Sequence, residues 1–574
     1  MKRSKGLLSL IALVLVLSTV LAACGGNNGG NASPTNAPAT NDGGNNSASN
    51  DGAAEGEEVL AADQNIKINL TSEPPTFDPQ QAQDSTSNAV LKLMYEGLTR
   101  VNDETGQPVE GMATDWEISP DGLVYTFNLR DAQWSNGDPV TANDFVFAWQ
   151  RVLDPEAADP APYAYQLYYL ANAEAYNTGE IADFEQVGVK ALDDKTLEVT
   201  LANPTPYFLG LLSFYTYYPV HSSAADNAQW ATKVDSQIVN GPFTLTEWTT
   251  GQSLAVTKNP NYYAADDIKA ETITFSIVSS GATELLSYRN GEIDRAGGPI
   301  GDIPLEQLPI VEKELPNEFA RKGIAAVYYY QINLTEKPFT NANIRKALAM
   351  AINRQGLIDN ITLGGQLPAF GFVPTGIQSN GEEFRAQVDH SQYFSEDLEQ
   401  AKTLLAQGLA EEGLDTLSFT LTYNTSEGHA KIATAVADMW KQSLGVDVKL
   451  ENKEWGIFLE ERHNLNYQVA RSGWSADYND PMTFLDMFVS NSGNNDMGYN
   501  NPEFDKLIQE AKTSSDNAVR QEKFVAAEKM LMDEMAIIPV YYYSNNSLTK
   551  PYLKGVTLDF SGAVDLSRAY KIEQ

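Results

Sequence analysis

A short stretch of the sequence, SGWSADYND (472–480), places the carboxylate of Asp477 among aromatic side chains. Two kinds of chemistry could use such a stretch. The segment from Gly473 begins like the turn that exposes a nucleophilic serine, but Asp477 stands where that turn needs a second glycine. The segment from Asp477 begins like a calcium loop, yet Met482 occupies the sixth position, where glycine is required. A binding or turn-forming carboxylate therefore fits better than a catalytic serine or a calcium ion.

The segments before Asp477 alternate between strand and helix patterns. Apolar side chains alternate at 417–423, 446–450 and 467–471, which predicts three strands. Apolar residues recur at helical spacing at 432–440 and 455–462, which predicts two intervening helices. This strand, helix, strand, helix, strand order predicts that the three strands pair in parallel.

This arrangement predicts a binding crevice, because ligands of open parallel sheets bind beyond the carboxyl ends of the strands. His429, Trp455 and Asp477 each follow one of the three predicted strands, so we expect them to face one crevice. Each also has an ordinary structural alternative: a histidine at a helix entry, a core tryptophan and an aspartate in a turn. Their joint occurrence at successive strand ends favours a binding site.

Length and composition limit the number of lobes and the classes of function that the chain can have. A chain of 574 residues exceeds one hydrophobic core, so two or three packed lobes are expected. The net charge of -37 predicts repulsion of nucleic acid. Four histidines and one cysteine argue against a metal site built from those residues, and neither a phosphate-binding loop nor a zinc-binding helix motif occurs. Catalytic carboxylate pairs stay open in a chain this acidic.

The N-terminus has the three parts of an export signal. A basic start is followed by an apolar run at 7–17 and by small residues before Cys24. The four residues ending at Cys24, LAAC, resemble the bacterial lipobox. The resemblance implies that residues 1–23 are a lipoprotein signal peptide and that Cys24 carries lipid. Two acyl chains would anchor the chain to the cell membrane, as in a Gram-positive bacterium. Residues 24–58, rich in Gly, Asn, Ala and Ser, are predicted to form a disordered tether.

Several long stretches resemble one family. SGWSADYNDPMTFLD, EWGIFLEERHNLNYQVAR and LTYNTSEGHAKIA are similar to the oligopeptide-binding (OppA-type) proteins of ABC importers, within family 5 of the extracytoplasmic solute-binding proteins. The likeness extends over roughly 59–574. It implies an α/β, two-lobed periplasmic-binding-protein fold of class II (cluster C), with an extra subdomain and a hinge between the lobes. The implied parts are lobe I at 59–93, 220–325 and 546–574, the extra subdomain at 94–219, and lobe II at 326–545.

The family resemblance also implies a function. The chain would be a monomeric lipoprotein that closes over short peptides and delivers them to the permease and ATPase subunits of an ABC importer, with no catalysis and no cofactor. Three alternatives stay open. They are a receptor for pheromone or cell-wall peptides in signalling, a binder of another solute such as a nickel complex, haem or a sugar, and an acidic hydrolase with paired carboxylates.

Matched position by position, the family implies a set of contact residues. Asp477 corresponds to the aspartate that pairs with the peptide α-amino group, which suits an ammonium that loses its hydration. The other implied contacts are the carboxylate-binding Arg462, Arg471 and His429, the pocket-lining Trp455, Trp474 and Tyr163, and, through the backbone, Ser475 and a strand from Gln83 to Ser85.

Four positions depart from the family pattern. Thr362 replaces a lysine that binds peptide carboxylates, Gln331 replaces a glutamate, and Gly297 and Ile324 replace tyrosines. These changes leave the amine anchor intact. They predict a different position for the peptide carboxylate, and hence a different preferred peptide length.

Overall fold

The computed structural model describes residues 58–102, 105–227 and 229–574. The predicted signal peptide, Cys24 and the tether up to residue 57 lie outside these residues and remain predictions. Within the described ranges, every helix is too short or too polar to cross a bilayer.

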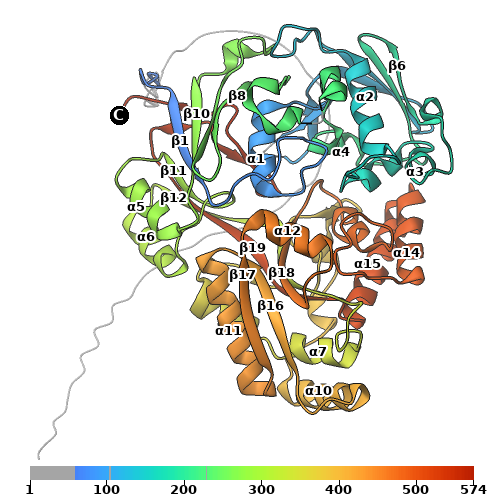
Figure 1. The fold of residues 1–574 in the computed structure, drawn as a ribbon, viewed down its shortest axis with the longest axis vertical. Helices are drawn as coiled ribbons and strands as arrows, with labels where there is room; N and C mark the ends of the chain where they lie inside the picture. Colours follow the sequence, from blue (N-terminus) through green and yellow to red (C-terminus); the bar gives the residue numbers. More distant parts are fainter. Residues whose placement is uncertain (1–57, 103–104, 228) are drawn as a thin grey trace, which may run out of the picture. The chain divides into compact units, whose positions relative to one another are not determined.

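A mixed sheet of eleven strands runs through the described part of the chain (Figure 1). The three strands at one end pair in parallel, as do β1, β10 and β11, whereas the two longest strands in the middle pair antiparallel with each other. In spatial order the strands are β17 (Asp447–Lys453), β16 (Ser418–Asn424), β18 (Val469–Ser475), β12 (Phe319–Ile332), β19 (Ile537–Thr549), β11 (Arg295–Gly297), β1 (Asn65–Leu70), β10 (Thr272–Ile277), β9 (Ser253–Lys258) and β8 (Phe243–Thr249), with β13 (Leu367–Pro368) beside β19.

The predicted strand and helix alternation before Asp477 is confirmed. β16, α11 (Glu427–Leu444), β17, α12 (Trp455–His463) and β18 follow one another along the chain. β16 lies between β17 and β18 and pairs with both in parallel, so the carboxyl ends of all three strands meet at one edge. Helix α11 packs along β16 and β17 (Figure 1). Trp440 anchors α11: its side chain is fully buried and its indole Nε1 donates to the Leu348 carbonyl at 2.8 Å.

The long central strands β12 and β19 coincide with two predicted lobe boundaries. The boundaries at 325/326 and 545/546 fall inside β12 and β19, which pair with each other over most of their length. Ala325 to Ile332 are all buried, so this part of β12 is a core strand. The register shifts between Gly323 and Val327. Two chain crossings side by side suit a hinge, and the division into lobes itself remains a prediction.

A separate four-stranded antiparallel sheet lies within the predicted extra subdomain. Helix α2 (Ala142–Leu153) packs beside the edge strand β6 (Val189–Asp193) of this sheet, and a capping box between Thr141 and Asp144 closes the first turn of α2. The strands of this sheet are, in spatial order, β4 (Ala113–Ile118), β5 (Val124–Leu129), β7 (Thr196–Thr200) and β6 (Val189–Asp193).

The other α-helices of the described residues complete the fold. They are α1 (Ser85–Met94), α3 (Ala173–Asn177), α4 (Phe208–Leu211), α5 (Gly281–Arg289), α6 (Leu308–Glu314), α7 (Ala342–Met350), α8 (Arg354–Leu357), α9 (Phe384–Gln387), α10 (Leu398–Glu412), α13 (Met482–Leu485), α14 (Pro502–Thr513) and α15 (Asn517–Asp533).

Candidate ligand-binding site

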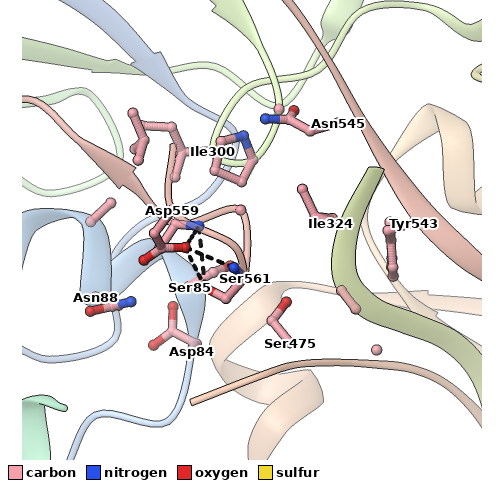
Figure 2. Close-up of a pocket in the computed structure, with 18 of the residues that line it drawn as sticks. Asp84, Ser85, Asn88, Ile300, Ile324, Ser475, Tyr543, Asn545, Asp559 and Ser561 are labelled. Atoms are coloured by element: carbon pink, nitrogen blue, oxygen red, sulfur yellow. Dashed lines mark hydrogen bonds between the residues drawn. The ribbon is translucent and has the colours of Figure 1, made fainter. Parts of the chain in front are cut away.

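A cavity of about 700 Å³ lies at the edge where β16, β17 and β18 end. His429, Trp455 and Asp477 all line it, which confirms the expectation that they face one crevice. Segments remote in sequence complete the wall, including the start of α1 and the end of β19. Figure 2 shows Asp84 and Asn88 at the blue helix α1, and Ser475, Ile324 and Tyr543 on other segments of the wall.

Asp477 faces the cavity, and the protein supplies its carboxylate with neutral hydrogen-bond donors. Its Oδ2 accepts hydrogen bonds from Gln166 Nε2 at 2.9 Å and from Thr483 Oγ1 at 3.3 Å. No lysine, arginine or histidine of the described residues forms an ion pair with it. Burial, together with the charge of Asp486, raises the pKa of Asp477 well above the usual range of an aspartate, and the two hydrogen bonds oppose that rise. The site therefore lacks a positive charge that a ligand can supply.

The same turn contains a second aspartate with a structural role. Asp480 is 5% exposed, and its Oδ1 accepts from the Met482 backbone N–H at 3.0 Å and from Arg520 Nη2 at 2.7 Å. The guanidinium of Arg520 also lies 4.9 Å from the ring centre of Tyr207. Asp480 thus holds the turn, which leaves the carboxylate of Asp477 free to face the cavity.

The three aromatic residues that the family pattern implies all line the cavity. Trp474 and Tyr163 both line the cavity, with ring centroids 6.3 Å apart. Tyr163 packs edge-on against Phe214, at 4.9 Å. Trp455 lines the cavity from the first turn of α12. These rings give the wall apolar surface beside its polar groups, which suits side chains of varied shape.

The positive charge available in the cavity belongs to Arg471. Its Nη2 donates to the Tyr543 hydroxyl at 2.6 Å and its Nη1 to Asn424 at 3.3 Å, while no carboxylate of the described residues pairs with it. His429 lies nearby with Nδ1 buried and without a partner in the described residues. Burial and the charge of Arg471 hold the pKa of His429 well below its usual range, so this imidazole is neutral.

Arg462 lines the cavity but is already engaged. Its Nη2 donates to Asp496 Oδ2 at 3.0 Å, and His463 contacts the other carboxylate oxygen at 3.3 Å. A peptide carboxylate would have to compete with Asp496 for this guanidinium. Among the predicted carboxylate-binding residues, Arg471 is therefore the best placed.

The predicted strand from Gln83 to Ser85 is wrong at Ser85, which is helical, whereas the backbone of Asp84 is extended. Gln83 precedes the helix without regular structure, Asp84 caps α1, and Ser85 is the first residue of that helix. The physical reason is that Asp84 accepts from the backbone N–H groups of Thr86 and Ser87, which starts a helix instead of extending the chain. Gln83, Ser85 and Ser475 all line the cavity.

The four residues that depart from the family pattern differ in whether they line the cavity. Ile324 lines the cavity, whereas Thr362, Gln331 and Gly297 are not among the described residues of its wall. Thr362 donates to Gln366 at 2.8 Å. Gln331 Nε2 donates to the Tyr467 hydroxyl at 3.0 Å, while its Oε1 is buried without a partner in the described residues.

Sequence reasoning missed some polar residues of the site. Gln166 comes from the predicted extra subdomain, more than 300 positions from Asp477, and no local pattern connects the two. Thr483 stands six residues after Asp477, and a turn signal could have suggested it. Asn545 is 5% exposed, lines the cavity and has both side-chain polar atoms without partners in the described residues (Figure 2).

The fold and the cavity define a class, the two-lobed solute-binding proteins. A family model described as "Bacterial extracellular solute-binding proteins, family 5 Middle" matches residues 107–496, and the chain belongs to this family. Its members are binding proteins and not enzymes.

Three individual proteins within this comparison are similar to the chain over most of its length. The oligopeptide-binding protein OppA of Bacillus subtilis (strain 168) is 41% identical, over 98% of this chain and 99% of that protein. The crystal structure of Haemophilus influenzae OppA in complex with RPPGFSPFR is 34% identical with a TM-score of 0.82, covering 90% of this chain and 100% of that one. The Escherichia coli murein tripeptide binding protein MppA is 33% identical with a TM-score of 0.82 and the same coverage.

Proposed function

We propose that this chain captures short peptides with a free amino terminus and delivers them to an ABC importer. The observation that carries the proposal is the carboxylate of Asp477, which faces the cavity with no basic partner among the described residues. Three similar proteins, named for oligopeptides, a bound nonapeptide and a murein tripeptide, support peptides as the ligand class.

The chemistry of Asp477 suits the α-amino group of a peptide. An ammonium enclosed in the cavity loses water, and a buried charge is tolerated only with an opposite charge and hydrogen bonds. Gln166 and Thr483 hold Oδ2, so Oδ1 stays open to a ligand donor. Arg471 would take the carboxylate at the other end of the peptide, and backbone pairing beside β18 would tolerate varied side chains.

Delivery and anchoring complete the proposal. The protein would work outside the cytoplasm of a Gram-positive bacterium as a monomer, tethered by lipid on Cys24, and would hand peptides to permease and ATPase subunits. Metabolic labelling with an alkyne fatty acid tests the anchor. Label on the wild type and none on Cys24→Ala would support lipidation, whereas equal labelling would contradict it.

Calorimetry with matched peptides tests the amine anchor. We expect a free tripeptide to bind and its N-acetylated form to bind at least tenfold more weakly, because acetylation removes the charge that pairs with Asp477. Equal affinities for the two peptides would reject the proposal.

The affinity is also expected to depend on pH. In the ligand-free protein the pKa of Asp477 is raised by burial and by Asp486, and an ammonium bound beside it would lower that pKa. Binding therefore releases a proton between the two pKa values, and affinity falls as the pH drops through the higher one, by up to about tenfold per pH unit. Dissociation constants measured downward from pH 7.5 check this result. The N-acetylated peptide should show a flatter profile, and identical profiles would refute the assignment.

The nature of the native ligand separates import from signalling. Mass spectrometry of protein purified from its host would find a mixture of peptides if the chain serves nutrient uptake. A single peptide or a murein fragment would instead favour a receptor role. Recovery of a nickel complex, haem or sugar would overturn the peptide proposal.

A further inference from the structure

Asp84 is one of several further carboxylates that line the cavity with Asp477. It lines the wall at the start of α1 and is 7% exposed. Its Oδ1 accepts from the backbone N–H groups of Thr86 at 2.9 Å and Ser87 at 3.0 Å, and from Trp455 Nε1 at 3.3 Å. Its Oδ2 is buried and has no hydrogen-bond partner in the described part of the chain. Figure 2 shows this carboxylate on the α1 side of the cavity.

The basic side chains near this end of the cavity contact other acids. Lys92 contacts Asp559 at 3.3 Å, and Arg100 contacts Glu96 at 3.3 Å. Asp84 takes part in no ion pair within the described ranges. A buried carboxylate without a counter-charge is costly, so it calls for a functional reason.

Helix capping accounts for only one of the two oxygens. An N-cap needs an acceptor for the first free N–H groups, and asparagine or serine serves as well as aspartate. The charge of Asp84 and its Oδ2 are therefore not required by α1. Both point to something that enters the cavity.

Asp84 and Asp477 are both close enough to Tyr215 for their charges to act on its hydroxyl. Tyr215 lines the cavity, and burial followed by the charges of Asp477 and Asp84 raises the pKa of its hydroxyl well above the usual range. Trp455 also connects the two regions, since it donates to Asp84 and follows β17 at the sheet edge. A ligand held at Asp477 can thus extend toward Asp84 within one cavity.

We propose that Asp84 forms a second cation subsite, which takes the ammonium or guanidinium of a basic peptide side chain while Asp477 holds the α-amino group. The placement of the peptide rests on the proposed function. The chain would therefore prefer peptides that carry lysine or arginine over neutral peptides of the same length. An ionic hydrogen bond to Oδ2 would satisfy the one oxygen that the protein leaves without a partner.

Calorimetry with alanine tripeptides and tetrapeptides tests this subsite. Each position is replaced in turn by lysine or by norleucine, its uncharged isostere, and binding is compared in wild type and Asp84→Asn. At one or more positions, lysine should bind about 10- to 100-fold tighter than norleucine to the wild type, and that preference should disappear in Asp84→Asn. Lysine no better than norleucine at every position, or a preference that persists in the variant, would overturn the subsite.

Two controls distinguish a cation subsite at Asp84 from a structural effect of Asp84 and from an effect of another carboxylate in the cavity wall. The asparagine of Asp84→Asn can still cap α1, so the affinity for norleucine peptides and the thermal midpoint should be nearly the same in both proteins. Asp565→Asn, which removes another carboxylate of the cavity wall, should keep the lysine preference, and its loss there would count against Asp84. If no peptide binds at all, both proposals fail, whereas binding without a lysine preference rejects only the subsite.

Discussion

Asp477→Asn is expected to weaken the binding of a free tripeptide by about 2–5 kcal/mol, roughly 30- to 5000-fold in Kd. Asparagine preserves the shape of the side chain but removes the charge that would face the peptide ammonium. Because that ammonium would then be enclosed without a counter-charge, the loss should greatly exceed that of one neutral hydrogen bond. Isothermal titration calorimetry provides the measurement.

N-acetylated peptides supply the matched control for Asp477→Asn. Wild type and Asp477→Asn should bind N-acetylated peptides with nearly equal affinity. In both of these complexes the contact between a peptide ammonium and the Asp477 carboxylate is absent. The two proteins and two peptides form a double-mutant cycle whose coupling energy isolates that contact. A coupling energy near zero would show that Asp477 acts only through the turn.

The stability of ligand-free Asp477→Asn distinguishes a binding residue from a structural one. The pKa of Asp477 is higher in the folded protein than in the unfolded chain. The free energy of unfolding therefore decreases as the pH rises through the interval between the two values, because ionisation is harder in the folded state. Removing the charge should leave the ligand-free variant at least as stable as wild type at neutral pH. Marked destabilisation would contradict this expectation.

Arg520→Met is expected to lower the free energy of unfolding by about 3–5 kcal/mol, because it leaves Asp480 buried without its partner. The two side chains are 4% and 8% exposed and lie 2.7 Å apart. Methionine also loses the donor to the Ala511 carbonyl at 3.3 Å. Urea unfolding monitored by circular dichroism measures the change.

Two further variants control for Arg520→Met. Lys529→Met removes the basic partner of Asp533 on the same helix α15, and both of those side chains are more than half exposed. Its cost should stay below about 1 kcal/mol. The double variant Asp480→Asn with Arg520→Met removes both charges and should recover part of the lost stability. If Arg520→Met and Lys529→Met lower the free energy of unfolding by the same amount, the buried pair of Arg520 and Asp480 has no special role in stability.

These predictions assign different roles to Asp477 and Asp480, which are three positions apart. Asp480 is satisfied by Arg520 and Met482 inside the protein, so its loss should affect stability. Asp477 has only neutral donors and faces the cavity, so its loss should affect binding. Local sequence cannot separate the two roles, because both are acidic residues in the same turn.

The local pattern of the sequence determined the secondary structure next to the site. Apolar periodicity identified β16, α11, β17, α12 and β18, because period and burial are coupled within each element. Their order then placed His429, Trp455 and Asp477 at one edge, because parallel strands share the side at which they end.

Tertiary structure decided how each of those groups is used. The state of a carboxylate depends on every segment packed against it, and those segments come from distant parts of the chain. Gln166 reaches Asp477 from 311 positions away, and Asp496 pairs with Arg462. Burial, together with the charge of Arg471, holds the pKa of His429 well below its usual range. Asp84, which the family pattern placed in a strand, caps helix α1, because the neighbouring N–H groups are within reach of its Oδ1. Its Oδ2 is buried without a partner in the described residues.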